Sequence, residues 1–166
     1  MDHVALELPE IQSLDLEAVL RAKGDEAWRQ LERSLVVEES GLDLAALGGF
    51  PGPLVKWMLD AAGAAGIGRT AVALGDARAV ARCSLLYRWG PAPGDCLVAP
   101  AAVAGQVVSP PRGDGGFGWD VVFVPAGQRH TNAEMAAEEK DRLSPRGLAW
   151  RALARHLAGR PATEVE

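Results

Sequence analysis

The stretch "LVVEESGLDLAALGGFPGPLVKW", residues 35–57, constrains the fold more than any other part of the sequence. It opens with three apolar and mostly β-branched residues, which predict a buried strand. The Gly/Pro-rich run in its second half predicts a loop. Beyond the loop, one helical face collects the apolar residues Leu54, Val55, Met58, Leu59 and Ala62. Pro53 suits the first turn of this helix, and Gly63 suits its C-terminal cap.

The rest of the chain alternates between the same two kinds of pattern. Apolar runs and alternations predict further strands over residues 3–8, 70–74, 79–89, 96–99, 103–108 and 121–124. Helical patterns cover residues 15–31, 132–142 and 145–158. Asp15 and Ser144 are typical N-cap residues, and Pro145 follows at the first helical position. Strands mixed with helices predict an α/β fold around one sheet. With neither an internal repeat nor a clear domain boundary visible, we expect one domain over residues 1–166.

Composition and charge narrow the classes of partner. The formal net charge of -5 argues against binding to nucleic acid or to an anionic membrane surface. Since the sequence holds no apolar run of the roughly 20 residues that cross a bilayer, we expect no membrane span. The first 15 residues lack a signal-peptide pattern, so we expect a cytoplasmic protein. Cys83 and Cys96 are expected to be reduced and to lie in or near strands, although a disulfide between them stays open.

Two neighbouring acids, Glu38 and Glu39, end the apolar run of the opening stretch. Successive side chains of a strand point to opposite faces, so only one of the two can face a given cleft. Ligand sites in α/β proteins favour strand ends, and a carboxylate there is a suitable Mg²⁺ ligand. The alternative is a solvated strand end. Glu10 follows the segment 3–8 and is an ordinary surface residue unless that segment lies beside residues 35–37.

The loop "GDGGFGWD", residues 113–120, combines four glycines with two aromatics and a final acid. Phe117 and Trp119 can stack on a flat heterocycle, and Asp120 can accept hydrogen bonds from it. The alternative is a tight loop whose aromatic rings cover the core.

Further along the chain, Lys140 and Arg146 are candidate ligand contacts. Taken by itself, Lys140 is more typical of a solvated helix surface. Arg146 falls in the first turn of the helix predicted over residues 145–158, where free backbone amides attract anions.

Taken together in chain order, six segments resemble the Ham1-type inosine triphosphate pyrophosphatase family. They are "LPEIQ" (8–12), "VVEESGLDLAALGGFPGPLVKW" (36–57), "FGWD" (117–120), "AEM" (133–135), "EEK" (138–140) and "SPR" (144–146). The resemblance implies hydrolysis of ITP, dITP and XTP to the monophosphate and pyrophosphate, dependent on Mg²⁺ or on Mn²⁺ in its place. It also implies an elongated, two-lobed fold with a mixed central sheet, a nucleotide cleft between the lobes, and a homodimer.

The resemblance also assigns roles to residues by their place in the motifs. Glu10 and Glu39 would hold the metal, and Glu39 would in addition lie near the attacking water. The residues that would contact the substrate are Lys23, Ser40, Phe117, Gly118, Trp119, Asp120, Lys140 and Arg146.

The sequence departs from the family pattern at three places. It begins after the strand and the Ser/Thr-Gly-Asn-x-x-Lys type loop that cradles the triphosphate, and an upstream start is one explanation of this difference. Glu39 stands where the family has aspartate, and Pro145 stands where it has a base-contacting histidine. These departures motivate a second interpretation, in which the chain is a nucleotide-binding paralogue with weak or no catalysis.

Overall fold

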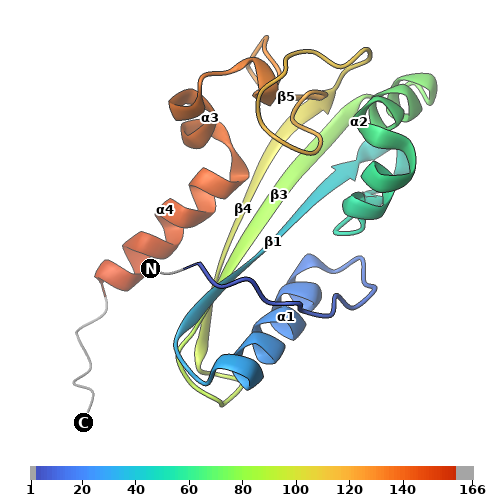
Figure 1. The fold of residues 1–166 in the computed structure, drawn as a ribbon. Coiled ribbons are helices and arrows are strands. Elements are labelled where there is room, and N and C mark those ends of the chain that lie inside the picture. Colours follow the sequence, from blue (N-terminus) through green and yellow to red (C-terminus); the bar gives the residue numbers. More distant parts are fainter. Residues whose placement is uncertain (1–2, 160–166) are drawn as a thin grey trace.

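One five-stranded sheet runs through the computed structural model, which describes residues 3–159 (Figure 1). Its strands follow the order β2-β1-β3-β4-β5, and every pairing is antiparallel. The strands are β1 (Leu35–Leu44), β2 (Pro51–Gly52), β3 (Arg78–Arg88), β4 (Cys96–Val107) and β5 (Phe123–Pro125). The predicted α/β class is therefore confirmed, with an antiparallel sheet in place of the mixed one within the described residues.

Helices cover both faces of this sheet. They are α1 (Leu16–Leu31), α2 (Val55–Ala73), α3 (Ala137–Leu143) and α4 (Pro145–Ala158), with two short 3-10 turns, η1 (Ala45–Leu47) and η2 (Asn132–Glu134). Val37 of β1 packs in the cluster that includes α1, whereas its neighbour Val36 packs in the cluster that includes α4. Because successive strand residues face opposite ways, α1 and α4 lie on opposite faces of the sheet.

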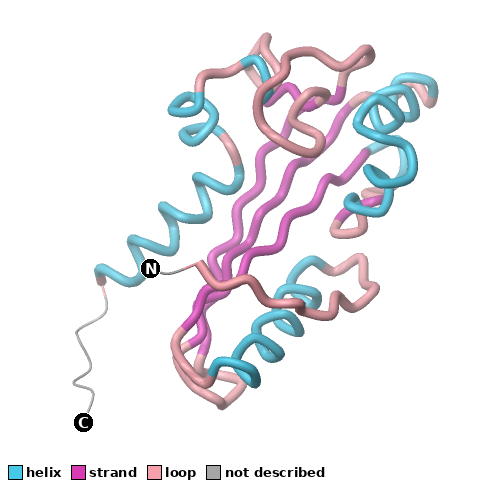
Figure 2. Tube along the Cα trace, viewed as in Figure 1, coloured by secondary structure: helices cyan, strands magenta, loops and turns pink. Residues whose placement is uncertain are grey.

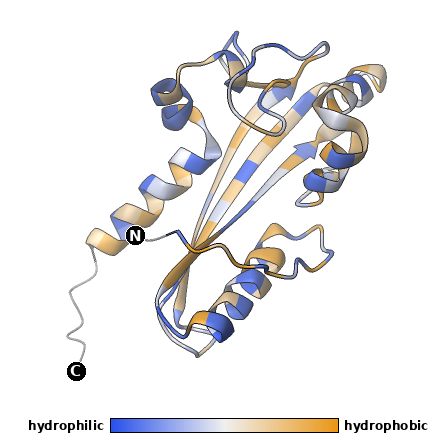
Figure 3. Cartoon of the chain, viewed as in Figure 1, coloured by the Kyte–Doolittle hydropathy of each residue, from blue (hydrophilic) through white to orange (hydrophobic). Residues whose placement is uncertain are grey.

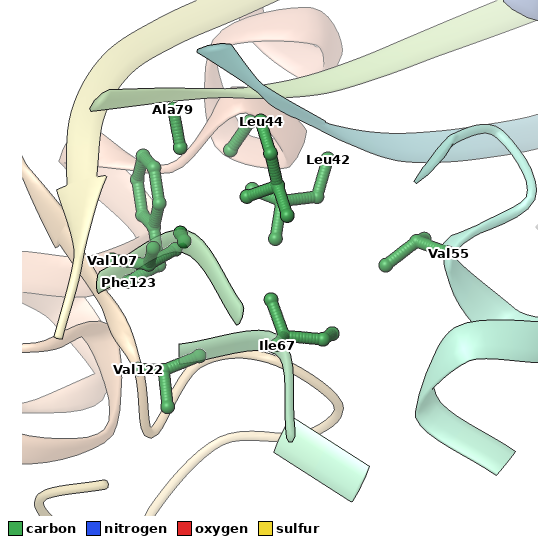
Figure 4. Packing of buried hydrophobic residues seen from close by; sticks show 10 residues of the cluster. Leu42, Leu44, Val55, Ile67, Ala79, Val107, Val122 and Phe123 are labelled. Carbon is green, nitrogen blue, oxygen red and sulfur yellow. The ribbon is translucent and has the colours of Figure 1, made fainter. Parts of the chain in front are cut away.

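The largest apolar cluster lies where the far half of β1 meets α2 and β5 (Figure 4). Leu42 and Leu44 of β1 meet Ile67 of α2 and Phe123 of β5 there, and all four side chains are fully buried. Leu42 and Leu44 are an even number of residues from Val36, so α2 and α4 cover the same face of β1.

The two predicted N-terminal caps, Asp15 and Ser144, are confirmed. Asp15 Oδ1 accepts hydrogen bonds from the amides of Glu17 and Ala18 at the start of α1. Ser144 Oγ accepts one from Gly147, and Pro145 occupies the first position of α4. Each cap satisfies amides that have no partner within the helix.

Two predictions around α2 are wrong. Residues 70–74 were expected as a strand, but α2 continues to Ala73. Gly63 was expected to cap the helix and instead forms a kink inside it, with φ 67° and ψ 171°. A left-handed backbone angle of this kind is available to glycine at little cost, so the helix resumes after Gly63 and takes in residues whose β-branched composition suggested a strand.

Other differences concern the ends of elements. Residues 3–8 form no strand, although Leu6 and Leu8 pack against the α1 cluster as the alternation suggested. The strands expected at 96–99 and 103–108 are one strand, β4, and the strand expected at 121–124 begins at Phe123. The helix expected over 132–142 is divided into η2 and α3.

The residues of α3 are mostly hydrophilic, whereas those of α2 are mostly hydrophobic (Figure 3). Between residues 3 and 159, no helix is both long and apolar enough to pass through a membrane. Cys83 and Cys96 are free thiols in β3 and β4, as expected.

Candidate functional site

Two of the predicted acids meet at one lysine on the α1 face of the sheet. Lys23, on α1, donates to Glu39 Oε2 at 2.5 Å and to Glu10 Oε1 at 3.2 Å. Its ammonium also lies 3.4 Å from the carbonyl oxygen of Glu38. The segment containing Glu10 therefore does lie beside β1, which was the condition for Glu10 and Glu39 to act together.

Glu39 is nearly buried, with 9% of its surface exposed. Burial raises the pKa of its carboxyl, because desolvation penalises the charged form more than the Lys23 ammonium favours it. Glu10, in contrast, is exposed. The pair thus combines one fixed, desolvated carboxylate with one that solvent can reach.

Glu38 points to the opposite face, as the pleat of a strand requires. Its Oε1 accepts hydrogen bonds from Arg146 Nε at 2.8 Å and from Arg146 Nη2 at 2.5 Å. Arg146 lies in the first turn of α4, so this ion pair joins β1 to the start of that helix.

A cavity of about 120 Å³ lies on this second face, between β1, β3 and the start of α4. Its walls include six of the predicted substrate contacts, namely Ser40, Phe117, Trp119, Asp120, Lys140 and Arg146. The loop between β4 and β5, which has no regular secondary structure, brings three of these residues to it (Figure 2). Ser40 follows Glu39 directly in β1 and faces the opposite way, so the cavity and the acid cluster lie on either side of this strand.

Asp120 is the centre of the polar contacts at the cavity. Its Oδ2 accepts from the Phe117 amide at 2.8 Å and from Lys140 Nζ at 2.5 Å, and its Oδ1 accepts from Asn132 Nδ2 at 3.2 Å. The loop closes tightly over this carboxylate: a Cβ at Gly116, whose φ is 72°, would lie 2.3 Å from Asp120 Oδ2. Asp120 is 5% exposed, so its charge is neutralised inside the protein by Lys140.

The two aromatic residues of the loop differ in their surroundings. Trp119 packs against the large apolar cluster, as expected for a ring that covers the core. Phe117 is 55% exposed, and its ring centroid lies 4.7 Å from Lys140 Nζ and 4.5 Å from the Arg146 guanidinium carbon. An exposed ring held between two cations can move to accept a flat ligand without loss of core packing.

The predicted site residues therefore gather at two adjoining places. Glu10, Lys23 and Glu39 form the acid cluster, and the six residues named above line the cavity. Gly118, the remaining predicted contact, lies in the same loop with φ 59° and is exposed. Asn132 was missed, because a lone asparagine after Thr131 is typical of a turn and carries no sign of its contact with Asp120.

The acid cluster is chemically suited to a divalent cation. Its two carboxylates already converge on one positive charge, the Lys23 ammonium. Between residues 3 and 159, no group of three or more His, Cys, Asp or Glu side chains is arranged as a metal site. Mg²⁺ commonly takes only one or two carboxylates and completes its ligands with water and substrate phosphates, so two converging acids fit this ion.

Comparisons with known proteins agree on one family. A family model described as the Ham1 family matches residues 2–156. Inosine triphosphate pyrophosphatase 2 of Trypanosoma cruzi is 40% identical over 158 residues, which span 95% of this chain and 80% of the relative. The dITP/XTP pyrophosphatase of Hyperthermus butylicus is 37% identical over 148 residues, or 89% of this chain and 76% of the relative. The structure of a HAM1 protein from Coxiella burnetii aligns with a TM-score of 0.81 at 27% identity and covers 92% of this chain and 82% of that one.

Proposed function

Because this chain belongs to the Ham1 family, we propose that it hydrolyses 6-oxopurine nucleoside triphosphates such as ITP, dITP and XTP to the monophosphate and pyrophosphate. The observation that carries the proposal is the meeting of Asp120, Lys140, Arg146 and Phe117 around one cavity that adjoins the acid cluster. The two places lie on opposite faces of β1, so a bound nucleotide would reach both by passing around this strand at Glu39 and Ser40. A flat base with a polar edge suits the cavity, and a metal-bound triphosphate suits the carboxylates.

Glu39 and Glu10 are the residues that would hold Mg²⁺, or Mn²⁺ in its place. The ion would neutralise the triphosphate and make its phosphorus easier to attack. Lys23 already lies between the two carboxylates. When a metal ion binds these carboxylates, the Lys23 ammonium would contact a phosphate of the substrate instead. Glu39, held in place by its burial and by its contact with Lys23, would orient the attacking water.

The cavity residues would bind the base. Asp120 accepts a hydrogen bond from an N–H on the base edge, and Lys140 donates to the C6 oxygen that distinguishes hypoxanthine and xanthine from adenine. An adenine amino group would meet the Lys140 donor instead, and such a buried mismatch costs about 1–3 kcal/mol.

The cavity must widen before a base can enter it. At about 120 Å³ it is smaller than the roughly 300 Å³ at which ligand pockets begin. Among its lining residues, Phe117 and the Arg146 side chain are exposed to solvent, while Asp120 is buried. Movement of Phe117 and Arg146 would open space for the base and leave in place the Asp120 carboxylate that contacts the base edge. Phe117 would then stack on the base, with Trp119 forming the wall nearer the core.

The test is release of pyrophosphate from ITP by the purified chain with and without Mg²⁺. We expect metal-dependent release, and a loss on the order of 100-fold or more in Glu39→Gln, which keeps the shape of the side chain and removes its charge. Glu7→Gln is the matched control, since Glu7 is an exposed acid in the same segment as Glu10. Folded protein that releases no pyrophosphate with any divalent metal, or Glu39→Gln with full activity, would overturn the proposal.

We propose further that the chain acts as one domain and as a homodimer in the cytoplasm. Support for self-association comes from two exposed rings, Phe50 at 44% and Trp57 at 57%, near the start of α2. Sedimentation equilibrium measures the state directly, and a monomer at micromolar concentration would contradict the dimer.

A further inference from the structure

Glu38 is an acid of β1 to which the proposed function gives no role. Its carboxylate lies on the cavity face of the strand, whereas Glu39 beside it lies on the face of Lys23. Arg146 donates to Glu38 Oε1 from Nε at 2.8 Å and from Nη2 at 2.5 Å. No other group within residues 3–159 accepts a hydrogen bond from the Arg146 guanidinium. Glu38 therefore fixes the position of this cation.

The position of Arg146 in turn supports the ring of Phe117. The ring centroid lies 4.5 Å from the Arg146 guanidinium carbon and 4.7 Å from Lys140 Nζ, so the ring contacts both cations. Phe117 and Arg146 both line the cavity, and with these side chains in place its volume is only about 120 Å³. Glu38 is not among the lining residues. It acts on the cavity through the two side chains that must move before a base can enter.

The two ion pairs at the cavity differ in how readily they can break. The side chains of Asp120 and Lys140 are 7% and 17% exposed, whereas those of Glu38 and Arg146 are 27% and 43% exposed. Both bonds from Arg146 also converge on a single oxygen of Glu38, so the pair lacks the two parallel bonds of a fork-to-fork contact. Solvent screens an exposed pair of this kind. The Glu38–Arg146 pair can therefore open while the Asp120–Lys140 pair stays intact.

Resting on the proposed function, we propose that Glu38 is a positioning residue that keeps the base cavity closed in the free protein. Its carboxylate holds Arg146 and, through Arg146, the ring of Phe117. A base enters when Arg146 leaves Glu38. Because a ligand binds only the fraction of molecules whose cavity is open, the closed state weakens the apparent affinity. Removing the charge of Glu38 raises the open fraction and should tighten the binding of a base.

The test measures binding of inosine to the whole chain by NMR titration without metal. Inosine has the 6-oxopurine base but no phosphate, so Glu38 does not repel it as it would repel a nucleotide. Shift changes at the amides of residues 117–120 locate the ligand at the cavity. We expect Glu38→Gln to bind inosine about two- to fivefold more tightly than the wild type, the value of one part-exposed ion pair. Glu7→Gln, which removes an exposed charge elsewhere, should bind as the wild type does.

Ionic strength provides a second readout that a purely structural role for Glu38 would not move. Salt screens the Glu38–Arg146 pair in the wild type, and this pair is absent in Glu38→Gln. The ratio of the two dissociation constants should therefore fall toward one as NaCl rises from about 0.05 M to about 1 M. Effects of salt on inosine itself are common to both proteins and cancel in the ratio.

The direction of the change separates this role from its opposite. If Glu38 instead holds Arg146 ready to contact the base, Glu38→Gln binds inosine more weakly, which overturns the inference. Equal affinities, or a ratio that does not respond to salt, would also overturn it. Binding of inosine by neither protein, together with no pyrophosphate release from ITP, would reject the proposed function itself. Release of pyrophosphate from ITP with equal inosine affinities would reject only the inference.

Discussion

The ion pair between Asp120 and Lys140 should contribute measurably to stability, in addition to any role in binding. The two charged atoms lie 2.5 Å apart, and the side chains are 7% and 17% exposed. At an effective dielectric constant of about 20 and a separation of about 4 Å, two unit charges attract by about 4 kcal/mol. Lys140 is partly solvated and part of this attraction is lost to screening, so we expect a coupling energy of about 2 kcal/mol.

A double-mutant cycle isolates this coupling. Asp120→Asn, Lys140→Met and the double variant are unfolded in urea, and the free energies of unfolding are compared with the wild type. Asp120→Asn alone should cost about 3 kcal/mol, because it leaves the Lys140 ammonium near the interior without its counter-charge. The double variant should cost less than the two single variants added together, by the coupling energy.

The exposed pair Asp76 and Arg78 provides a control cycle in the same protein. These side chains are 29% and 81% exposed, so solvent screens most of their attraction. We expect a much smaller coupling for Asp76→Asn and Arg78→Met than for the buried pair. Equal couplings in the two cycles would refute the reasoning that burial strengthens the Asp120–Lys140 pair.

Three further predictions concern stability. Burial raises the pKa of the Cys83 thiol to about 11 from an ordinary 9, so the folded state keeps a proton that the unfolded state loses. Stability should therefore fall between pH 9 and pH 11, by up to about 1.4 kcal/mol per pH unit more than in Cys83→Ala, as measured by urea unfolding at each pH. Ser144→Ala removes the cap of α4 and should cost about 1 kcal/mol of stability in thermal unfolding. Unchanged stability would refute the capping role. Gly68→Ala places a Cβ 2.3 Å from the Val108 carbonyl oxygen and should cost about 1–3 kcal/mol, whereas Gly94→Ala, with nothing within 4 Å, should be nearly neutral.

Local sequence signals were sufficient where residues only a few positions apart determine where an element begins. Asp15 and Ser144 identified helix starts because a cap acts on amides only two or three residues away. The signals failed where the structure of a segment depends on packing against another part of the chain. The alternation of residues 3–8 predicted a strand, yet a strand requires a partner for its backbone, and the described chain pairs none with this segment. Gly63 was interpreted as an end because a left-handed glycine can terminate a helix or kink it, and only packing distinguishes the two outcomes.

The predictions for the candidate site differ in the same way. That Glu38 and Glu39 face opposite sides follows from the pleat alone, and the structure confirms it through their partners Arg146 and Lys23. The position of the Glu10 segment beside β1 depends on tertiary packing. The sequence could therefore give it only as a condition for Glu10 and Glu39 to act together. The contact of Asn132 with Asp120 joins residues 12 positions apart through a loop and a turn, and no short-range pattern encodes it.

The opposite directions of Glu38 and Glu39 make the length of β1 as important as its chemistry. Gain or loss of one residue near the start of this strand would turn each of these side chains to the other face. Glu39 would then leave the face of Lys23 and Glu38 would leave the face of Arg146, so each cation would lose its present partner even though every amino acid of the site was still there. Sequence libraries built on this chain should therefore hold the number of residues in β1 constant, in addition to keeping the side chains of the site and of the core.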